Sequence, residues 1–288
     1  MEEKKPGKNN SELNNSVRNA PIGVFDSGLG GLTVVREIMR NLPDESITYF
    51  GDTARVPYGN KSGETVIRYS RQIVHFLEEK QVKAIVVACN TASALALDTI
   101  EKEISVPIIG VVRPGADMAI ASTTRKKIGV IATEGTIRSG LYRKLICGAD
   151  PEMQVYEKAC PLFVPLVEEG WTKDPITEEV ARRYLQEILD DGIDTLIMGC
   201  THYPLLRSLL KKVVGDSVQL INPAYETAQA LGRMLDEKGL RHDPVSVEDE
   251  SGRYCFYASD SVEHFVDFAN RILPYTLVGA RQVAIENY

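Results

Sequence analysis

The sequence of 288 residues lacks a long hydrophobic run and a dense cluster of basic residues. No apolar stretch approaches the roughly 18 residues that a membrane-spanning helix needs, and residues 1–20 are polar, without the hydrophobic segment of a secretory signal. The net charge is −7, and no basic run follows the first few residues, whereas nucleic acids are bound by clustered Lys and Arg. We therefore expect a cytoplasmic protein that binds neither a membrane nor nucleic acid.

Cysteine is scarce, and the five cysteines are scattered along the chain. An odd number of scattered cysteines in a chain of this length indicates reduced thiols rather than a disulfide framework. The apolar share of 43% and the charged share of 25% are typical of a globular enzyme. A structural zinc site needs four ligands in recognisable spacing, and the four histidines show no such spacing, so no metal is expected.

The glycine-rich turn at residues 26–31 (Asp-Ser-Gly-Leu-Gly-Gly) lacks the pattern of a nucleotide-binding loop. Counted from Gly28, the G-x-G-x-x-G motif needs a glycine where Thr33 stands, and no Gly-Lys-Ser/Thr follows. The turn joins a short buried strand to a helical pattern, and the bare amides at a helix start suit a carboxylate. We expect Asp26 and Ser27 to face the bound molecule, although Asp26 could instead cap the helix, and the two roles are compatible.

Two distant segments share one plan. Residues 88–93 (Ala-Cys-Asn-Thr-Ala-Ser) and residues 199–204 (Gly-Cys-Thr-His-Tyr-Pro) each follow a run with buried-strand character and lead into a helical pattern. Cys89 and Cys200 therefore lie at the carboxyl ends of two strands. Ligands of open α/β sheets bind at that edge, so two thiols could approach one small molecule from opposite sides.

Strand and helix patterns alternate along the chain, which predicts parallel sheets with right-handed crossovers. The pattern then restarts, because residues 128–136 resemble residues 22–28 and residues 218–223 echo residues 106–114. We read this as an internal duplication. It predicts two similar parallel-sheet α/β domains related by pseudo-two-fold symmetry, with the active site in the interdomain cleft, a preferred place for small ligands.

The expected organisation has four parts. The polar start is expected to be a disordered leader, the acidic stretch at residues 242–252 a flexible loop, and the chain after it returns to the first domain. The predicted parts are the leader at 1–20, the first α/β domain at 21–112 plus 225–273, the second α/β domain at 113–224, and a peripheral C-terminal end at 274–288.

Four motifs resemble those of the glutamate racemases, in the aspartate/glutamate racemase superfamily. The motifs keep their order and spacing, and they occupy residues 25–34, 51–59, 88–93 and 199–206. The resemblance extends from about residue 21 to residue 272. It implies a homodimeric, cofactor-independent and metal-independent isomerase that interconverts L- and D-glutamate and supplies D-glutamate for peptidoglycan.

Racemisation removes the α-proton from one face of the carbon and returns a proton to the other face, so two acid–base groups must flank the carbon. A thiolate and a thiol can exchange these roles, and Cys89 and Cys200 are the expected pair. A thiol with a pKa near 8.5 needs a neighbour that steers its proton; the candidates are Asp26 beside Cys89 and His202 beside Cys200. The resemblance implies that Cys89 acts on D-glutamate and Cys200 on L-glutamate.

The carbanion must be stabilised without an electron-sink cofactor, so amides and hydroxyls at the substrate carboxylate are expected to do much of this work. By resemblance, the glutamate site is lined by Asp26, Ser27, Tyr58, Gly59, Asn90, Thr91, Thr201 and His202. Asp52 and Glu168 are expected near the same centre, with roles less defined than those of the cysteines.

Other interpretations stay open. Cys147, Cys160 and Cys255 are expected to be small buried hydrophobes, Tyr58 could be a packing residue, and His202 could be a structural hydrogen-bond donor. A related enzyme acting on aspartate would share the cysteines; the loop at 51–59 and the Cys-Thr-His-Tyr-Pro sequence favour glutamate. A non-enzymatic sensor or inhibitor of a partner protein would need no pair of thiols.

Overall fold

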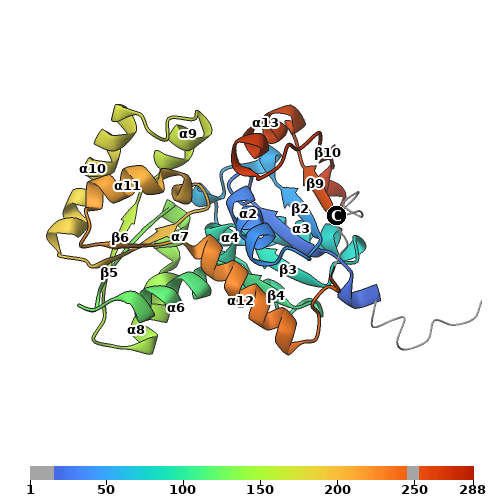
Figure 1. Cartoon of the computed structure of the whole chain (residues 1–288), viewed down its shortest axis with the longest axis horizontal. Coiled ribbons are helices and arrows are strands. Elements are labelled where there is room, and N and C mark those ends of the chain that lie inside the picture. Colours follow the sequence, from blue (N-terminus) through green and yellow to red (C-terminus); the bar gives the residue numbers. More distant parts are fainter. Residues whose placement is uncertain (1–15, 245–252) are drawn as a thin grey trace, which may run out of the picture.

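The computed structural model describes residues 16–244 and 253–288 and shows two parallel β-sheets side by side (Figure 1). The first sheet has the strand order β10-β9-β2-β1-β3-β4 and the second has the order β6-β5-β7-β8. The strands are β1 (Ile22–Asp26), β2 (Ile47–Gly51), β3 (Ala84–Val87), β4 (Ile108–Gly110), β5 (Lys127–Ala132), β6 (Gln154–Ala159), β7 (Thr195–Gly199), β8 (Gln219–Ile221), β9 (Tyr254–Ala258) and β10 (Arg281–Gln282).

Helices cover both sheets, as parallel strands require, because such strands are buried on both faces. The α-helices are α2 (Leu32–Asn41), α3 (Gly63–Glu79), α4 (Asn90–Leu95), α5 (Leu97–Ile100), α6 (Val112–Ser122), α7 (Glu134–Ser139), α8 (Leu141–Ala149), α9 (Phe163–Glu168), α10 (Pro175–Asp190), α11 (Arg207–Val214), α12 (Pro223–Glu237) and α13 (Val262–Ile272). Short 3-10 helices are η1 (Thr53–Arg55), η2 (Tyr58–Asn60), η3 (Tyr203–Leu206) and η4 (Ile285–Asn287).

The internal duplication appears in the strand order. In the first sheet β1 pairs with β2 and β3, and β3 with β4; in the second sheet β5 pairs with β6 and β7, and β7 with β8. All of these pairs are parallel, so the predicted fold class of two similar parallel-sheet α/β units is confirmed. Cys89 and Cys200 follow β3 and β7, which occupy equivalent places in their sheets.

Burial explains why the sequence forms these elements. All five residues of β1 are buried, and α2 turns Leu32, Val35 and Ile38 into the core. Helix α12 packs against α2 of the first half and α6 of the second, and it lies between the two halves in Figure 1. Strand β4 has only three residues, and α6 begins at Val112, two residues after it ends.

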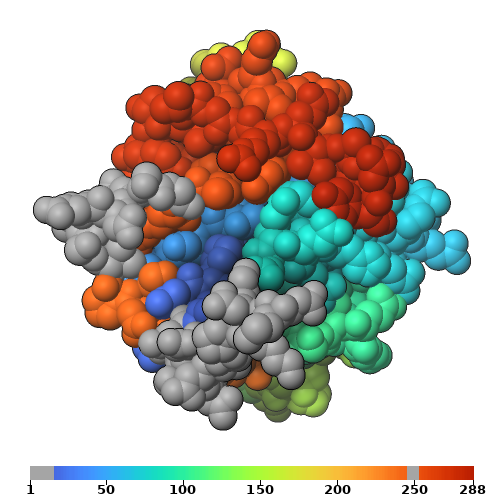
Figure 2. Space-filling view, turned by 90° about the vertical axis from the view of Figure 1, so that its right-hand side faces the viewer, coloured from blue at the N-terminus to red at the C-terminus, as the bar shows by residue number. Residues whose placement is uncertain are grey.

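The C-terminal end, expected to be peripheral, packs against the first half. Strand β10 pairs in parallel with β9, Ile285 is fully buried, and the Tyr288 ring meets the Phe76 ring edge-on with centroids 5.3 Å apart. Figure 2 shows this red segment on the surface beside the cyan region that includes α3. The other domain boundaries stay a prediction.

Of the expected leader at residues 1–20, the structure describes residues 16–20, which contact the rest of the chain. Arg18 donates a hydrogen bond to Asp243 and another, 3.2 Å long, to the carbonyl of Arg241. Residues 1–15, and residues 245–252 of the expected flexible loop, lie outside the described residues. Within the described ranges, no helix combines the length and the apolar character needed to cross a bilayer.

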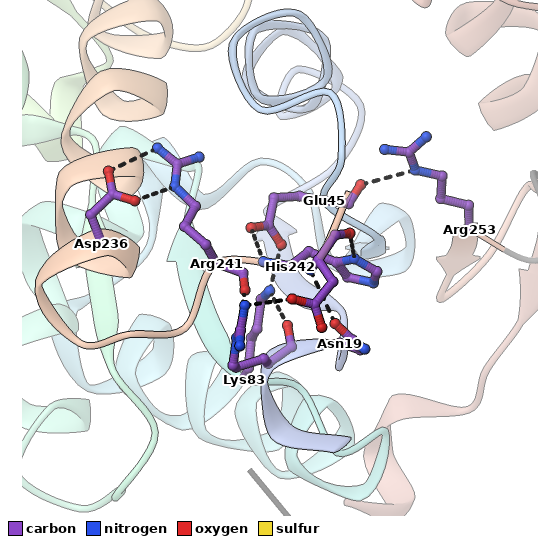
Figure 3. A network of polar contacts seen from close by, with 9 residues as sticks. Asn19, Glu45, Lys83, Asp236, Arg241, His242 and Arg253 are labelled. Atoms are coloured by element: carbon purple, nitrogen blue, oxygen red, sulfur yellow. Dashed lines mark hydrogen bonds and ion pairs between the residues drawn. The ribbon is translucent and has the colours of Figure 1, made fainter. Parts of the chain in front are cut away.

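A buried ion pair fastens this N-terminal segment to the first sheet (Figure 3). Lys83 Nζ lies 2.5 Å from Glu45 Oε2, with side-chain exposures of 0% and 2%. Lys83 also donates to the carbonyl of Arg18, and Glu45 Oε1 accepts the amide of His242 over 3.0 Å. The pair therefore joins three segments that are distant in sequence. It lies at the amino ends of the strands, whereas Cys89 follows the carboxyl end of β3.

Removal of Lys83 should destabilise the fold strongly, because Glu45 would remain buried without its counter-ion. We expect Lys83→Met to lower the free energy of unfolding in urea by about 3–5 kcal/mol. Adding Glu45→Gln should recover most of this loss, since glutamine is neutral and still accepts the His242 amide. The matched control Lys126→Met, at a half-exposed ion pair with Asp150 and Glu152, should cost much less, because exposed ion pairs contribute little to stability. Equal losses at Lys83 and Lys126 would contradict this account.

Candidate active site

A cavity of about 510 Å³ lies between the two halves and receives side chains from both. Its walls include residues that come after the carboxyl ends of β1 and β3 in the first sheet and of β5 and β7 in the second. The lining residues are Ser27, Gly28, Leu29, Val56, Pro57, Tyr58, Gly59, Asn60, Cys89, Asn90, Thr91, Thr133, Glu134, Pro161, Val164, Pro165, Glu168, Cys200, Thr201 and His202.

Of the residues predicted for the site, all but Asp26 and Asp52 line this cavity. Thr133 and Glu134, which follow β5, also line it and were not predicted. The duplication offered a signal for Thr133, because it occupies in the repeat the place that Ser27 has after β1. The predicted residues thus share one cavity, and their roles in binding and catalysis stay predictions.

The Cys89 thiol is surrounded by neutral hydrogen-bonding groups. Its Sγ lies 3.5 Å from Ser27 Oγ and accepts the amide of Ala92 over 3.4 Å, as the N-cap of α4. Burial, and to a lesser extent the charge of Asp26, raise the pKa of this thiol to about 12; Ser27 and the Ala92 amide act in the opposite direction. Cys89 is therefore protonated at neutral pH.

On the other side of the cavity, a charged pair lies beside the sulfur of Cys200, in contrast to the neutral groups around Cys89. His202 Nδ1 lies 3.8 Å from Cys200 Sγ, and His202 Nε2 lies 2.9 Å from Glu168 Oε1. Burial alone would lower the pKa of His202, but the hydrogen bonds and charges of Cys200 and Glu168 outweigh it and raise the pKa to about 10. The two sulfurs therefore differ in their neighbours: Cys200 lies beside a histidine cation, and Cys89 does not.

Asp26 is fully buried behind the cavity wall and is not hydrogen-bonded to Cys89 within the described chain. Its Oδ2 accepts the amide of Gly28 over 3.0 Å, and its Oδ1 accepts the Thr201 hydroxyl over 3.3 Å. Burial raises its pKa, against the His202 charge and the amides of the turn. The alternative that Asp26 caps the following helix is wrong, because the N-cap of α2 is Gly31 and no side chain caps it; Asp26 binds the turn and acts on Cys89 through its charge.

The close contact between the halves depends on a glycine. A Cβ on Gly30 would lie 2.3 Å from Thr201 Oγ1 and 2.5 Å from His202 Nδ1. Any other residue at this position would therefore push the turn after β1 away from the segment that carries Cys200. Thr33 strengthens the same contact, since its hydroxyl donates to the carbonyl of Thr201 over 2.9 Å.

Asp52 is a buried acceptor that holds Tyr58, and it does not reach the cavity. The Tyr58 hydroxyl donates to Asp52 Oδ2, the Ser259 hydroxyl donates to Oδ1 over 2.9 Å, and Arg55 Nε donates over 2.7 Å. Burial is the main cause that raises the pKa of Asp52, and these donors oppose it. With its hydroxyl committed to Asp52, Tyr58 presents its ring to the cavity.

Hydroxyl groups also join the two halves across the cavity. Thr91 Oγ1 from the start of α4 lies 2.9 Å from Thr133 Oγ1 and 3.3 Å from Thr136 Oγ1 in the second half. Among the residues that the structure describes, no three His, Cys, Asp or Glu side chains are grouped so that they could hold a metal ion. The five cysteines, all within the described ranges, form no disulfide.

The cavity between the two halves brings Cys89 and Cys200 together, and comparisons with known proteins identify the family to which the chain belongs. A family model described as Asp/Glu/Hydantoin racemase matches residues 22–231. The glutamate racemase of Geobacter metallireducens is 48% identical over 92% of this chain and 97% of its own length. The crystal structure of a glutamate racemase isoform from Bacillus anthracis covers 92% of this chain and 97% of its own, at 41% identity and a TM-score of 0.85.

A solved structure from Francisella tularensis, a glutamate racemase in complex with D-glutamate, covers 94% of this chain and 100% of its own length. Its sequence identity is 38% and the TM-score is 0.87. The chain therefore belongs to the Asp/Glu/hydantoin racemase family and, within it, to the glutamate racemases, a group of amino-acid isomerases.

The protonation of His202 can be measured directly by titration of the histidine signals in NMR spectra. We expect His202 to remain cationic up to a pH of about 10. Glu168→Gln should lower this pKa, because it removes a carboxylate that stabilises the cation. The neighbouring, exposed Glu169 is the matched control, and Glu169→Gln should leave the titration unchanged. A His202 pKa near 6.5, or equal shifts in both variants, would refute the proposed charged pair.

Proposed function

We propose that this protein is a cofactor-independent glutamate racemase that uses Cys89 and Cys200 as its two acid–base groups. One observation carries the proposal: a single cavity holds the Cys89 thiol on one side and, on the other, the Cys200 thiol beside the pair of His202 and Glu168. A reaction that takes a proton from one face of a carbon and returns one to the other needs an acid–base group on each side.

In the direction from L- to D-glutamate, the Cys200 thiolate removes the α-proton and the Cys89 thiol delivers its proton to the opposite face. The electron pair of the broken C–H bond passes to the α-carbon and its carboxylate, and the new C–H bond takes it up again. Cys200 ends as the thiol and Cys89 as the thiolate, the state that accepts D-glutamate. The His202 cation, held by Glu168, favours the negative charge on Cys200 before the transfer.

The substrate is proposed to bind through neutral donors rather than through a basic cluster. Ser27, Asn90, Thr91 and Thr201 line the cavity with hydroxyl and amide groups, and Tyr58 closes one wall. Donors of this kind at the α-carboxylate stabilise the negative charge that develops on deprotonation. The F. tularensis relative is described in complex with D-glutamate, which supports the same substrate here.

The product D-glutamate is proposed to supply peptidoglycan synthesis, and the enzyme is proposed to act in the cytoplasm as a homodimer. These assignments rest on the resemblance to the glutamate racemases. Within the described ranges no helix could cross a bilayer.

Loss of either thiol should stop racemisation in both directions, because each step needs one thiolate and one thiol. After dialysis with chelator and reductant present, we expect the unaltered protein to racemise L-glutamate in a circular-dichroism assay. Cys89→Ala and Cys200→Ala should each lower kcat/KM about a thousandfold or more, in line with the contribution of general acid–base catalysis. Cys147, which lies outside the cavity, is the control, and Cys147→Ala should stay active.

Three results would count against this assignment. Retention of most activity in either cysteine variant would indicate a single base. Restoration of a dialysed, inactive protein by a metal ion or pyridoxal phosphate would indicate a different chemistry. Turnover of L-aspartate with no turnover of L-glutamate would keep the thiol mechanism and change the substrate.

Deuterated water tests the placement of the two thiols on opposite faces of the carbon. The donor thiol exchanges with solvent before the reaction, so newly formed D-glutamate should carry deuterium at the α-carbon. Unreacted L-glutamate should remain largely protiated at low conversion, which mass spectrometry of the separated enantiomers measures. Substantial protium in the product, or deuterium in the substrate at a comparable rate, would indicate one base that serves both faces.

A further inference from the structure

Tyr142 lies outside the cavity and contacts both of the turns that carry the thiols. It belongs to the first turn of α8 in the second half, and it is 1% exposed. The Tyr142 hydroxyl donates a buried hydrogen bond of 2.8 Å to Oδ1 of Asn90, the residue after Cys89. This bond connects the second half to the first half directly behind the cavity wall.

The Tyr142 ring rests against the other cysteine segment. A Cβ on Gly199 would lie 3.2 Å from Tyr142 Cε2 and 2.9 Å from the carbonyl oxygen of Ile131. Gly199 is the last residue of β7 and directly precedes Cys200. The missing side chain at Gly199 therefore lets the ring lie close to the backbone of Gly199, the residue before Cys200.

The hydrogen bond also fixes which end of the Asn90 amide faces the cavity. Burial raises the pKa of Tyr142 far above its usual range, so the hydroxyl keeps its proton and must have an acceptor. The acceptor is Oδ1, and the Asn90 amide nitrogen has no hydrogen-bond partner among the described residues. Because Asn90 lines the cavity, the two N–H donors of its amide are left for a ligand, a suitable arrangement for a carboxylate.

We propose that Tyr142 is a positioning residue for the racemisation: its hydroxyl orients the Asn90 amide toward the substrate carboxylate, and its ring sets the spacing between the Cys89 and Cys200 turns. This inference rests on the proposed function and adds a residue that does not touch the substrate. Without the hydroxyl, the amide is free to rotate and to present its oxygen to the carboxylate, which repels it.

The test is a double-mutant cycle between Tyr142→Phe and Asn90→Ala, measured in the kinetics of L- and D-glutamate. The phenylalanine keeps the ring against Gly199 and removes only the hydroxyl. We expect KM to rise about tenfold in Tyr142→Phe with kcat changed about twofold or less, as for the loss of one hydrogen bond made in both ground and transition states. In the Asn90→Ala background, Tyr142→Phe should add almost no further loss, because it acts through Asn90.

Tyr203→Phe is the matched control, since Tyr203 is fully buried and its hydroxyl donates over 2.8 Å to the carbonyl of Cys160. Its effect should be independent of Asn90, so the losses of Tyr203→Phe and Asn90→Ala should multiply. Losses that also multiply for Tyr142 and Asn90, or a lower Tm of Tyr142→Phe with an unchanged KM, would overturn the inference and leave Tyr142 a purely structural residue.

A readout without turnover separates this inference from the proposed function. The side-chain amide signals of Asn90 in NMR spectra, assigned by their loss in Asn90→Ala, should shift in Tyr142→Phe and stay in place in Tyr203→Phe. If these signals shift but the unaltered protein does not racemise glutamate, the proposed function fails and the Tyr142 contact stands. If the protein racemises glutamate but the signals do not shift, only the positioning role fails.

Discussion

Two sulfurs can flank one carbon atom only if the sheets that carry them turn the carboxyl ends of their strands toward each other. Several contacts between the two halves of the chain keep these strand ends facing each other. Gly30 permits the contact between the turn after β1 and the segment after β7, Thr33 and Asp26 hydrogen-bond to Thr201 across it, and Thr91 meets Thr133 on the other side. The polar contacts between the halves thus surround the cavity itself.

The two sides of this cavity are alike in topology and unlike in electrostatics. Cys89 has Ser27 and a backbone amide as hydrogen-bond partners, whereas Cys200 has a histidine that a carboxylate keeps charged. A duplicated fold would by itself give the two thiols equivalent neighbours. The difference comes from His202 and Glu168, which have no counterpart in direct contact with Cys89 among the described residues.

Local patterns were sufficient to predict the parts of the fold and the site that depend on neighbours in sequence. Periodicity in the sequence predicts the two strand–cysteine–helix segments and the duplicated strand order. The two sheets, and the place of both cysteines at the carboxyl ends of strands, were therefore predictable. Glu168 was expected near the centre only by resemblance, because its contact with His202 joins residues 34 positions apart. Asp26 lies beside Cys89 in the prediction but hydrogen-bonds to Thr201, since the other half supplies a donor that no local pattern reveals. Strand β10 and the ion pair of Lys83 with Glu45 were not predicted for the same reason, because both need segments that are distant in the chain.

The integration of the C-terminal end also affects how copies of this protein can associate. Strand β10 has two residues and occupies one edge of the first sheet, and β4, with three residues, occupies the other. Such short edges offer little unpaired backbone to the strand of another molecule, which protects a sheet from growing by addition of further chains. A complex built on this half must therefore form through side chains on its helices and loops, and its specificity is set by the residues exposed there rather than by the backbone.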